Sequence, residues 1–559
     1  MKTLFVAINS QYIHSNLAVW YLKSACNNDK NITIMEFNIN QQLDIIFSEI
    51  ISEKPDCIAF SVYIWNIDYV FRLVRDIKKA DNNIKIILGG PEVSYNAEEV
   101  LLKYNEYIDF INLGAGEIYL PVLLEYIKTK NNTLCYILEE NNEKIVKMPP
   151  YYDFNDIKSP YMDEMLEFNK DKIIYYESSR GCPFSCSYCL SSCEKYLDYL
   201  NLDRVYEELI TIVNKGYKLI KFVDRTFNAN ILRAEKLLEF IINETKDTVF
   251  HFEIAADILS DNFINILKKA QNGKIQLEIG IQTTNENTLE EINRKTDTKK
   301  VLENIEKLIA LNNTAVHIDL IAGLPCEEFD SFKKSFNDIF SLGAHDIQLG
   351  FLKLLHGTKL RDNKEQYGMK HRGYPPYEVI KTKDISSDQL ILLKKLEKQV
   401  DMFYNSHRFC MTINYLLKKF DSSFDLFLNL AESIQNFTKP IGIVNQYKEL
   451  LFYCENKLNQ NEVEIIKQLL RFDYRHINIR NKIPECINIK HSETKTDEII
   501  EKSGLYNKLK INSRKELKAR LYVEQFDINP ITLEEINTDI IFDLKDISKI
   551  IGFSKYYII

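Results

Sequence analysis

The sequence has no apolar run of the roughly 20 residues that a membrane-spanning helix needs. Its first residues, MKTLFVAINSQYIHSN, include a short apolar stretch but neither the long apolar core nor the cleavage site of a signal peptide. Basic residues are not in excess either, because the formal net charge is −9. We therefore expect a cytoplasmic protein without a membrane partner. The acidic balance also disfavours non-specific binding of nucleic acid.

The chain is too long for one hydrophobic core, because single cores stop growing at roughly 250–300 residues and this chain has 559. Two or three domains are therefore expected. Most of its 11 cysteines are scattered, but positions 182, 186, 189 and 193 fall close together. In a large chain without a secretion signal, such a group indicates metal or redox chemistry rather than a disulfide framework.

The first 145 residues alternate between strand-like and helix-like patterns. Apolar, β-branched runs occur at residues 4–8, 32–37, 57–64, 84–88 and 110–113. This alternation predicts an α/β fold with a Rossmann-like, doubly wound parallel sheet over residues 1–145. Ligands of such sheets bind beyond the carboxyl ends of the strands. There the loops LGGPEVS and LGAGE carry glycines, which permit a close backbone approach.

Three further regions follow. Residues 134–138 and 144–148 predict a small hairpin, and residues 146–171 predict a linker that contains Pro, Asp and Asn. Strand and helix patterns alternate over residues 172–379, which predicts a partial (β/α)6 barrel of the TIM type with active residues at the carboxyl ends of its strands. Residues 380–559 predict a mainly helical C-terminal domain of unknown role, without metal-ligand spacing or a phosphate loop.

The grouped cysteines lie in the segment Cys182-Pro-Phe-Ser-Cys186-Ser-Tyr-Cys189, with Cys193 four residues further on. A zinc ribbon needs a second Cys or His pair about 12–20 residues away, and the sequence has none. A ferredoxin run begins with a two-residue gap and gives its last Cys to a second cluster. Here the first gap is three residues, and there is no second set of cysteines.

The spacing C-x3-C-x2-C, just beyond the first barrel strand, resembles the motif of radical SAM enzymes. The resemblance implies that Cys182, Cys186 and Cys189 hold a [4Fe–4S] cluster with one open iron. That iron binds S-adenosylmethionine (SAM), which is cleaved to a 5′-deoxyadenosyl radical. A fourth thiolate would close the iron, so we expect Cys193 to be a buried residue or a substrate-side thiol.

Other segments resemble the same family in the same order: residues 221–228 the "FVDDTF" segment, 278–283 the "E-x-G-x-Q" strand, 293–295 the "N-R" helix start, 319–325 the "D-x-I-x-G-L-P" strand, and 348–358 the "L-P-G-T" turn. The sequence departs from the family at Cys326, where Gly is usual, and at His356, where Pro is usual. Their roles stay open. The resemblance implies that SAM contacts Tyr188, Asp224, Glu278, Gln282 and Arg294.

A Rossmann-like domain ahead of such a barrel resembles a cobalamin-binding domain. The segments YIHSNLA, CPFSCSYCLSS and FVDRTFNAN resemble the cobalamin (B12)-binding radical SAM family, in the subgroup with a DUF4080-type C-terminal domain. The Asp-x-His-x-x-Gly motif is absent, so no histidine is expected on cobalt. The resemblance implies that cobalamin contacts His14, Tyr63, Gly89, Gly90, Pro91, Glu92, Gly114, Gly116 and Glu117. His14 has the alternative of capping the first helix, and the domain has the alternatives of binding another nucleotide or being a remnant.

These resemblances imply a cobalamin-dependent radical SAM methyltransferase that acts on an unactivated carbon. Its substrate is an unidentified small molecule or peptide, and its electrons come from a flavodoxin- or ferredoxin-like donor. One alternative is a cobalamin-containing radical SAM enzyme that catalyses an oxidation, cyclisation or rearrangement without methyl transfer. Another is an iron–sulfur electron-transfer or binding protein that does not cleave SAM. An RNA-modifying enzyme is disfavoured by the acidic balance and by the lack of a recognisable RNA-binding module.

Overall fold

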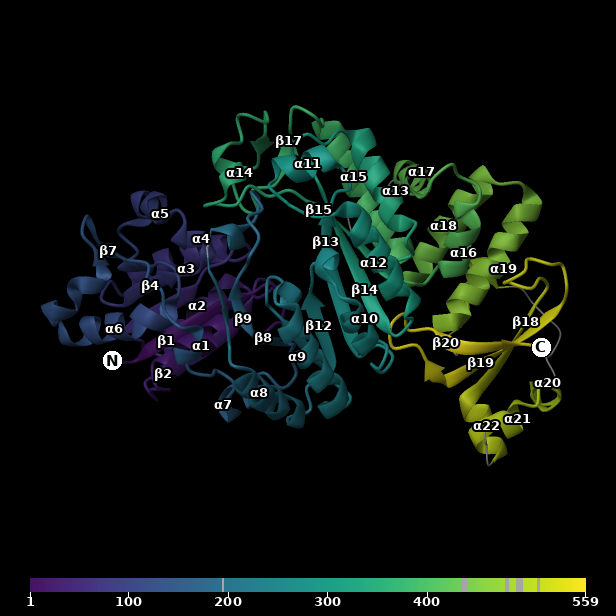
Figure 1. The fold of residues 1–559 in the computed structure, drawn as a ribbon, viewed down its shortest axis with the longest axis horizontal. Helices are drawn as coiled ribbons and strands as arrows, with labels where there is room; N and C mark the ends of the chain where they lie inside the picture. Colours follow the sequence, from purple (N-terminus) through teal and green to yellow (C-terminus); the bar gives the residue numbers. More distant parts are fainter. Residues whose placement is uncertain (194–195, 435–440, 478–481, 489–495, 510–512) are drawn as a thin grey trace.

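The computed structural model describes residues 1–559 except 194–195, 435–440, 478–481, 489–495 and 510–512. Three regions lie side by side along the long axis of Figure 1: a purple N-terminal region, a teal central region and a green-to-yellow C-terminal region. Within the described ranges, no helix is both long enough and apolar enough to cross a membrane.

The N-terminal region is a seven-stranded sheet in the order β2-β1-β3-β4-β5-β7-β6. Its strands are β1 Thr3–Asn9, β2 Ile32–Asn38, β3 Cys57–Ser61, β4 Lys85–Gly89, β5 Phe110–Asn112, β6 Leu138–Glu139 and β7 Asn142–Val146. Its helices are α1 Leu17–Ala25, α2 Leu43–Ser52, α3 Ile67–Ala80, α4 Pro91–Ser94, α5 Ala97–Tyr104 and α6 Gly116–Thr129. All neighbouring strands are parallel except the β6–β7 pair.

Strand β1 shows why this sheet is doubly wound. All seven of its residues are buried, as expected of a central parallel strand that is covered on both faces. Phe5 and Ala7 belong to one hydrophobic core, whereas Leu4, Val6 and Ile8 belong to another on the opposite face. The Rossmann-like fold class predicted from the sequence is confirmed.

The expected hairpin is present but shorter than predicted. Its first arm is mostly a 3-10 helix, Asn132–Ile137 (η1), and only β6 pairs antiparallel with β7. Strand β7 also pairs in parallel with β5 through Ile145 and Val146. Both side chains are buried, and this burial favours joining the main sheet over forming an isolated hairpin.

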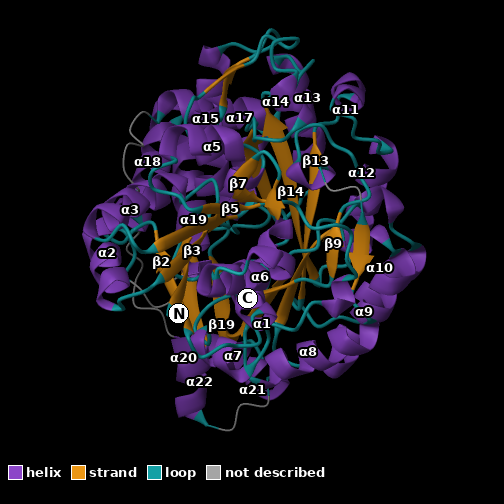
Figure 2. Cartoon of the chain, turned by 90° about the vertical axis from the view of Figure 1, so that its left-hand side faces the viewer, coloured by secondary structure: helices purple, strands orange, loops and turns teal. Residues whose placement is uncertain are grey.

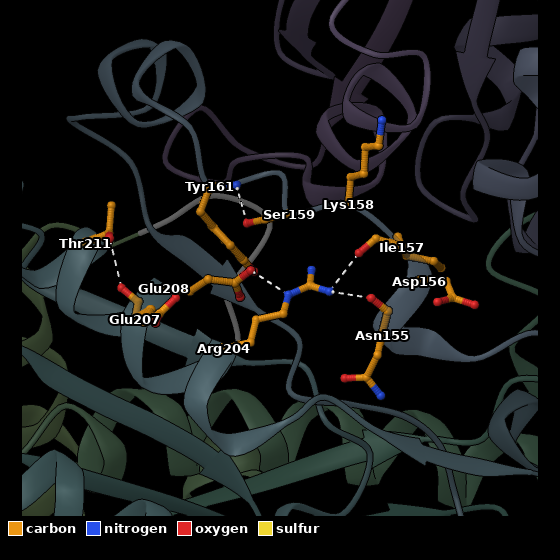
Figure 3. Close-up of a pocket in the computed structure, with 10 residues that line it drawn as sticks. All are labelled: Asn155, Asp156, Ile157, Lys158, Ser159, Tyr161, Arg204, Glu207, Glu208 and Thr211. Atoms are coloured by element: carbon orange, nitrogen blue, oxygen red, sulfur yellow. Dashed lines mark hydrogen bonds and ion pairs between the residues drawn. The ribbon is translucent and has the colours of Figure 1, made fainter.

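The connector after β7 packs on the central region through η2 (Phe154–Asp156) and α7 (Asp163–Phe168). Arg204 of α8 holds it in place, as Figure 3 shows. Its Nη1 donates to the carbonyls of Ile157 (2.7 Å) and Asn155 (3.3 Å), and its Nε donates to Glu208. The hollow drawn in Figure 3 therefore lies at the seam between the connector and α8.

The central region is an open, all-parallel sheet of six strands in the order β15-β14-β13-β12-β11-β8. The strands are β8 Ile174–Tyr176, β11 Leu219–Phe222, β12 Val249–Glu253, β13 Ile275–Gln282, β14 Thr314–Ala322 and β15 Asp346–Phe351. The helices are α8 Leu202–Asn214, α9 Ile231–Glu244, α10 Asp261–Leu267, α11 Glu286–Glu291, α12 Thr298–Ala310, α13 Phe329–Phe340 and α14 Lys359–Asp362. This sheet confirms the predicted six-strand partial barrel, and its strands are among the orange arrows of Figure 2.

Short pairs of strands lie at the margins of this sheet: β9 Ser179–Gly181 with β10 Leu197–Tyr199, and β16 Lys370–His371 with β17 Val379–Lys381. The open edge at β15 is satisfied by Asn405, which ends the π-helical segment η6 (Asp401–Asn405). Its side chain accepts from the backbone amide of Ile347 and donates to the carbonyl of the same residue. The side-chain amide of Asn405 thus makes, at Ile347, the two backbone hydrogen bonds that a neighbouring strand would make.

The C-terminal region is helix-rich, as predicted, and ends in a small antiparallel sheet in the order β18-β19-β20. The helices are α15 Ser387–Val400, α16 Cys410–Leu417, α17 Ser423–Ser433, α18 Ile443–Lys457, α19 Gln460–Ile477, α20 Thr496–Lys502, α21 Leu505–Lys508 and α22 Arg514–Arg520. The strands are β18 Leu521–Phe526, β19 Thr538–Ile547 and β20 Ser554–Ile558. Helices α15 to α19 extend the core of the central sheet.

Candidate functional site

Asp224 fixes the chain as it enters the cysteine loop. It lies two residues beyond β11, and its side chain is almost completely buried. One oxygen accepts the backbone amides of Ser178 and Ser179 at 2.7 and 3.0 Å, and the other accepts the Ser178 hydroxyl at 2.5 Å. Burial raises the pKa of Asp224 to about 6. These contacts give Asp224 a positioning role, whereas the contact with SAM that the resemblance implies stays a prediction.

A glycine starts the cysteine loop because β10 crosses β9 closely there. Gly181 has a φ of +100°, and a Cβ at this position would lie 1.8 Å from the carbonyl oxygen of Tyr196. Only glycine tolerates both the backbone conformation and the contact. The chain can therefore turn sharply into Cys182.

The three cysteines of the motif share the loop between β9 and the 3-10 turn η3 (Leu190–Ser192). Cys186 is buried, Cys182 and Cys189 are half-buried, and none of them forms a disulfide. Among the described residues, no group of His, Cys, Asp or Glu side chains is gathered tightly enough to hold a single metal ion. Three thiolates on one loop are the donor set that an iron–sulfur cluster takes, with its ligands on separate irons. The residues therefore fit the cluster that the motif implies.

Arg294 brings positive charge to the cysteine loop from the segment after α11. Its Nη1 lies 3.6 Å from the Cys186 sulfur and 3.5 Å from the Tyr188 hydroxyl, and Nη2 donates to the carbonyl of Gly280. Burial raises the pKa of the Cys186 thiol, and the nearby guanidinium opposes that rise. Arg294 thus favours the thiolate that a cluster needs.

The two departures from the family motifs have structural explanations. Cys326 has a φ of +59°, in the left-handed region that favours the glycine usual at this position. His356 packs edge-on against Tyr377 with ring centres 5.0 Å apart, and burial lowers its pKa to about 4. The Cys193 thiol donates to the carbonyl of Gly357, beside His356. That bond favours a packing role for Cys193 over a role as a fourth ligand of the cluster.

The interior face of the central sheet is rich in titratable groups. His251 on β12 bonds Glu278 on β13 at 2.9 Å, and this bond lowers the pKa of Glu278. Burial, and next the charge of Glu278, raises the pKa of Glu253 to about 7 and that of Asp319 to about 8. Gln282 ends β13 with a buried Oε1 that has no partner. Two carboxyls with raised pKa values and an unused acceptor therefore lie near the site where the resemblance puts SAM and substrate.

A cavity of about 620 Å³ separates the N-terminal sheet from the cysteine loop. The N-terminal region contributes the carboxyl ends of β3, β4 and β5, and the central region contributes Arg180, Gly181, Leu190, Ser191 and Arg225. Eight of the expected cobalamin contacts line it: Tyr63, Gly89, Gly90, Pro91, Glu92, Gly114, Gly116 and Glu117. Its size falls within the usual range of cofactor pockets.

The wall chemistry fits cobalamin, whose corrin ring carries amide groups. Much of the lining is apolar or aromatic, such as the Tyr63–Trp65 pair, which stacks with ring centres 4.4 Å apart. Asn112 on this wall has a buried Oδ1 without a hydrogen-bond partner. Buried acceptors are normally satisfied, so this oxygen is an unused acceptor beside the cavity.

His14 does not belong to this wall. Its Nδ1 lies 2.6 Å from the Tyr175 hydroxyl at the start of the central sheet. The helix-capping alternative is also wrong, because Asn16 is the residue that caps α1, with its side chain accepting the amide of Val19. His14 therefore joins two regions of the protein, and the predicted contact with cobalamin has no support from this geometry.

The sequence predicted neither Arg180 nor Arg225 as site residues. The Arg180 guanidinium donates to Glu117 at 3.0 Å, to Glu177 at 2.8 Å and to the Tyr152 hydroxyl at 2.9 Å. It thus ties the start of α6 to the residues just before Cys182. The only signal in the sequence was an arginine two residues before a cysteine motif, and such a residue has no partner until the chain is folded.

The comparison with family models gives three matches that follow one another along the chain. Residues 3–124 match the B12 binding domain, residues 176–339 match the radical SAM superfamily, and residues 365–542 match DUF4080, a protein family of unknown function. The first two matches contain the two faces of the cavity, and the second begins just before the cysteine loop.

Individual relatives are distant. The cobalamin-dependent radical SAM methyltransferase TokK of Streptomyces tokunonensis is 23% identical over 57% of this chain, which spans about half (50%) of the length of TokK. The uncharacterized methyltransferase PH0819 of Pyrococcus horikoshii is 24% identical, and the match covers 69% of this chain and 87% of that protein. The structure of the cobalamin-dependent SAM radical enzyme OxsB aligns with a TM-score of 0.58 and 14% identity, over 90% of this chain and 83% of that one.

The fold, the cysteine loop and these matches define the class: a chain that combines a radical SAM domain with a B12-binding domain. The cofactors of the class are a [4Fe–4S] cluster, SAM and cobalamin, as predicted. The chain carries in order a B12-binding domain, a radical SAM domain and, over residues 365–542, a match to DUF4080.

Proposed function

We propose that this enzyme methylates an unactivated carbon of a small-molecule or peptide substrate. The observation that carries the proposal is the shared cavity: the loops after β4 and β5 form one wall, and residues on both sides of the cysteine loop form the other. When bound, the cluster with SAM supplies a hydrogen-abstracting radical, and cobalamin supplies a transferable methyl group. A substrate in this cavity would lie between the two sources. The methyltransferases among the distant relatives support this reading.

The residues of the chain have positioning roles in this proposal. Asp224 and Arg294 hold the two sides of the cysteine loop, and Arg180 joins that loop to the B12-binding domain. Apolar wall residues such as Leu190, Val223 and Leu355 favour exclusion of water, which a radical reaction requires. Electrons for the cluster would come from an external flavodoxin- or ferredoxin-like donor.

A second candidate is an oxidation, cyclisation or rearrangement without methyl transfer. Glu253 and Asp319 favour it, because their raised pKa values of about 7 and about 8 suit proton acceptors near neutral pH. Methyl transfer to a substrate radical has no step in which such a group would take up a proton. Either reaction uses the same cavity and the same cysteine loop.

The test is anaerobic reconstitution of the full chain, with absorption spectra to quantify cluster and cobalamin, followed by product analysis from SAM. 5′-Deoxyadenosine together with S-adenosylhomocysteine is expected for methylation. 5′-Deoxyadenosine without S-adenosylhomocysteine would favour the second candidate. If 5′-deoxyadenosine forms but cobalamin does not bind, both cobalamin-based candidates fail. An intact cluster without SAM cleavage would indicate an electron-transfer or binding protein.

A further inference from the structure

All but one of the charged side chains on the cavity wall are hydrogen-bonded or ion-paired within the protein. Arg180 bonds both Glu117 and Glu177, so these three wall residues form one compact group. Glu92, the other acidic residue of the wall, accepts a hydrogen bond from the Tyr377 hydroxyl at 2.5 Å. Each of these side chains therefore has a partner within the protein.

Arg225 is different. Among the wall residues that the structure describes, it is the charged one whose side chain has no hydrogen bond or ion pair to the protein. It follows the buried Asp224 directly and is itself exposed. A guanidinium in this position keeps all five of its donors available.

The position of Arg225 is central to the site. Its charge acts on Tyr63, on the B12-binding side of the cavity, and on Glu253, which ends β12 inside the central sheet. It therefore lies where a ligand would reach from the cobalamin loops towards the SAM side. A guanidinium has a planar fork of donors that matches carboxylates and phosphates, which it binds through paired hydrogen bonds.

We propose that Arg225 binds an acidic group of the substrate, a carboxylate or a phosphate, and so orients the substrate between the two cofactors. The inference rests on the proposed function and narrows its substrate to anionic molecules. The phosphodiester of cobalamin carries the same chemistry, so the experiment must separate these two sources of the anion.

The experiment compares the wild-type chain with Arg225→Gln and Arg225→Lys, each loaded with cluster and cobalamin. Equilibrium dialysis measures binding of radiolabelled glutarate and of inorganic phosphate, and absorption spectra measure the cobalamin content of each protein. Arg72→Gln is the matched control, because Arg72 is an exposed arginine of α3 that does not line the cavity. Deoxyadenosine formation from SAM is measured on the same wild-type preparation.

We expect saturable binding of at least one anion to the wild type, at least tenfold weaker binding to Arg225→Gln, partial recovery in Arg225→Lys and no change in Arg72→Gln. Cobalamin content should be equal in all four proteins. Loss of cobalamin from Arg225→Gln would overturn the inference and assign Arg225 to the cofactor. Equal anion binding by wild type and Arg225→Gln would also overturn it. A wild type that binds anions through Arg225 but cleaves no SAM would refute the proposed function alone.

Discussion

At the scale of single residues, the cysteine loop depends on groups that are not ligands. Asp224 satisfies two backbone amides that would otherwise be buried without acceptors, and Gly181 leaves room for the neighbouring strand. Arg294 adds a positive charge beside Cys186. Contacts within the chain therefore fix the shape of the loop, and a loop fixed in this way loses less conformational entropy when it holds a cluster.

Two cysteine substitutions distinguish a ligand of the cluster from a nearby cysteine that does not bind it. Cys186→Ala should abolish the roughly 400 nm absorption typical of a [4Fe–4S] cluster, because a lost thiolate leaves one iron unheld. Cys193→Ala should keep the cluster and SAM cleavage, because its thiol is bonded to the carbonyl of Gly357. Iron and sulfide analysis after anaerobic reconstitution measures both. A cluster retained in Cys186→Ala, or lost in Cys193→Ala, would contradict the assignment.

Asp224 should make the cysteine loop pH-sensitive. Its pKa is about 6, raised by burial above the ordinary value of 3.8, so the folded state holds the proton more tightly than the unfolded state. The stability from this group is fully present below the unfolded pKa and is lost as pH rises through about 6. Relative to Asp224→Asn, the wild-type loop should lose about 1.4 kcal/mol of opening free energy between about pH 5 and about pH 8.

Hydrogen exchange of the peptide around Ser178, corrected for intrinsic rates, measures that difference. The control is Asp76→Asn, a change at an exposed site on α3 for which we expect no such pH dependence. A difference in opening free energy between wild type and Asp224→Asn that stays constant across this range would show that Asp224 does not titrate there.

At the scale of elements, Arg180 is the junction between the B12-binding domain and the cysteine loop. It joins β9 to the first turn of α6 through Glu117, and its guanidinium also packs over Phe154 of the connector at 4.5 Å. One side chain therefore sets the spacing of three elements. Each of them bounds the cavity or the loop that a cofactor would occupy.

Arg180→Met should destabilise the protein by about 3–5 kcal/mol, the usual cost of leaving partly buried carboxylates without their cation. Urea unfolding measures this, and absorption of the purified protein measures cobalamin retention, which should fall. Adding Glu117→Gln to Arg180→Met should recover part of the stability, whereas Arg72→Met alone should change neither quantity. If Arg180→Met keeps the stability and the cobalamin content of the wild type, Arg180 does not join the B12-binding domain to the cysteine loop.

Element boundaries show what a local pattern can and cannot predict. The parallel strands of both sheets were predicted because each is a short apolar run between helix-length segments. The prediction of a strand for most of the first arm of the hairpin was wrong, because residues 132–137 have no strand partner and form a 3-10 helix. Strand β7 also pairs with β5, which ends 30 residues before β7 begins, and no local pattern encodes that pairing.

At the scale of the whole molecule, the two sheets share a hydrophobic core, and polar contacts join them on either side of the cavity. On one side His14 bonds Tyr175, and Lys172 pairs with the buried Glu36 at 2.9 Å. On the other side the Tyr377 hydroxyl bonds Glu92. The width of the cavity depends on these contacts rather than on either domain alone.

Tyr377→Phe should loosen this arrangement. The change leaves the carboxyl of Glu92 buried without its donor, at a cost of about 1–3 kcal/mol. We expect faster limited proteolysis in the connector and weaker retention of cobalamin, because Glu92 lines the cavity. Tyr374→Phe is the matched control, because Tyr374 is 56% exposed. Proteolysis and cobalamin content equal to the wild type would show that the contact does not set the cavity width.

The sequence by itself determined the class of the protein and the order of its domains. Cys182, Cys186 and Cys189 lie within eight residues of one another, and the glycine loops directly follow their strands. Short-range spacing along the chain is therefore enough to predict both sites. The same holds for the alternating pattern that predicts each sheet, because strands and helices have fixed periods.

Only the tertiary structure decided how these parts meet. It brought eight of the expected cobalamin contacts into one cavity and excluded His14, it made Asp224 an anchor of the cysteine loop, and it left Arg225 without a partner. Each of these outcomes depends on groups tens to hundreds of residues apart, such as Arg180 with Glu117 or Tyr377 with Glu92. Whether a buried charge is paired is a property of its surroundings in the folded chain, and for that reason the sequence could not supply it.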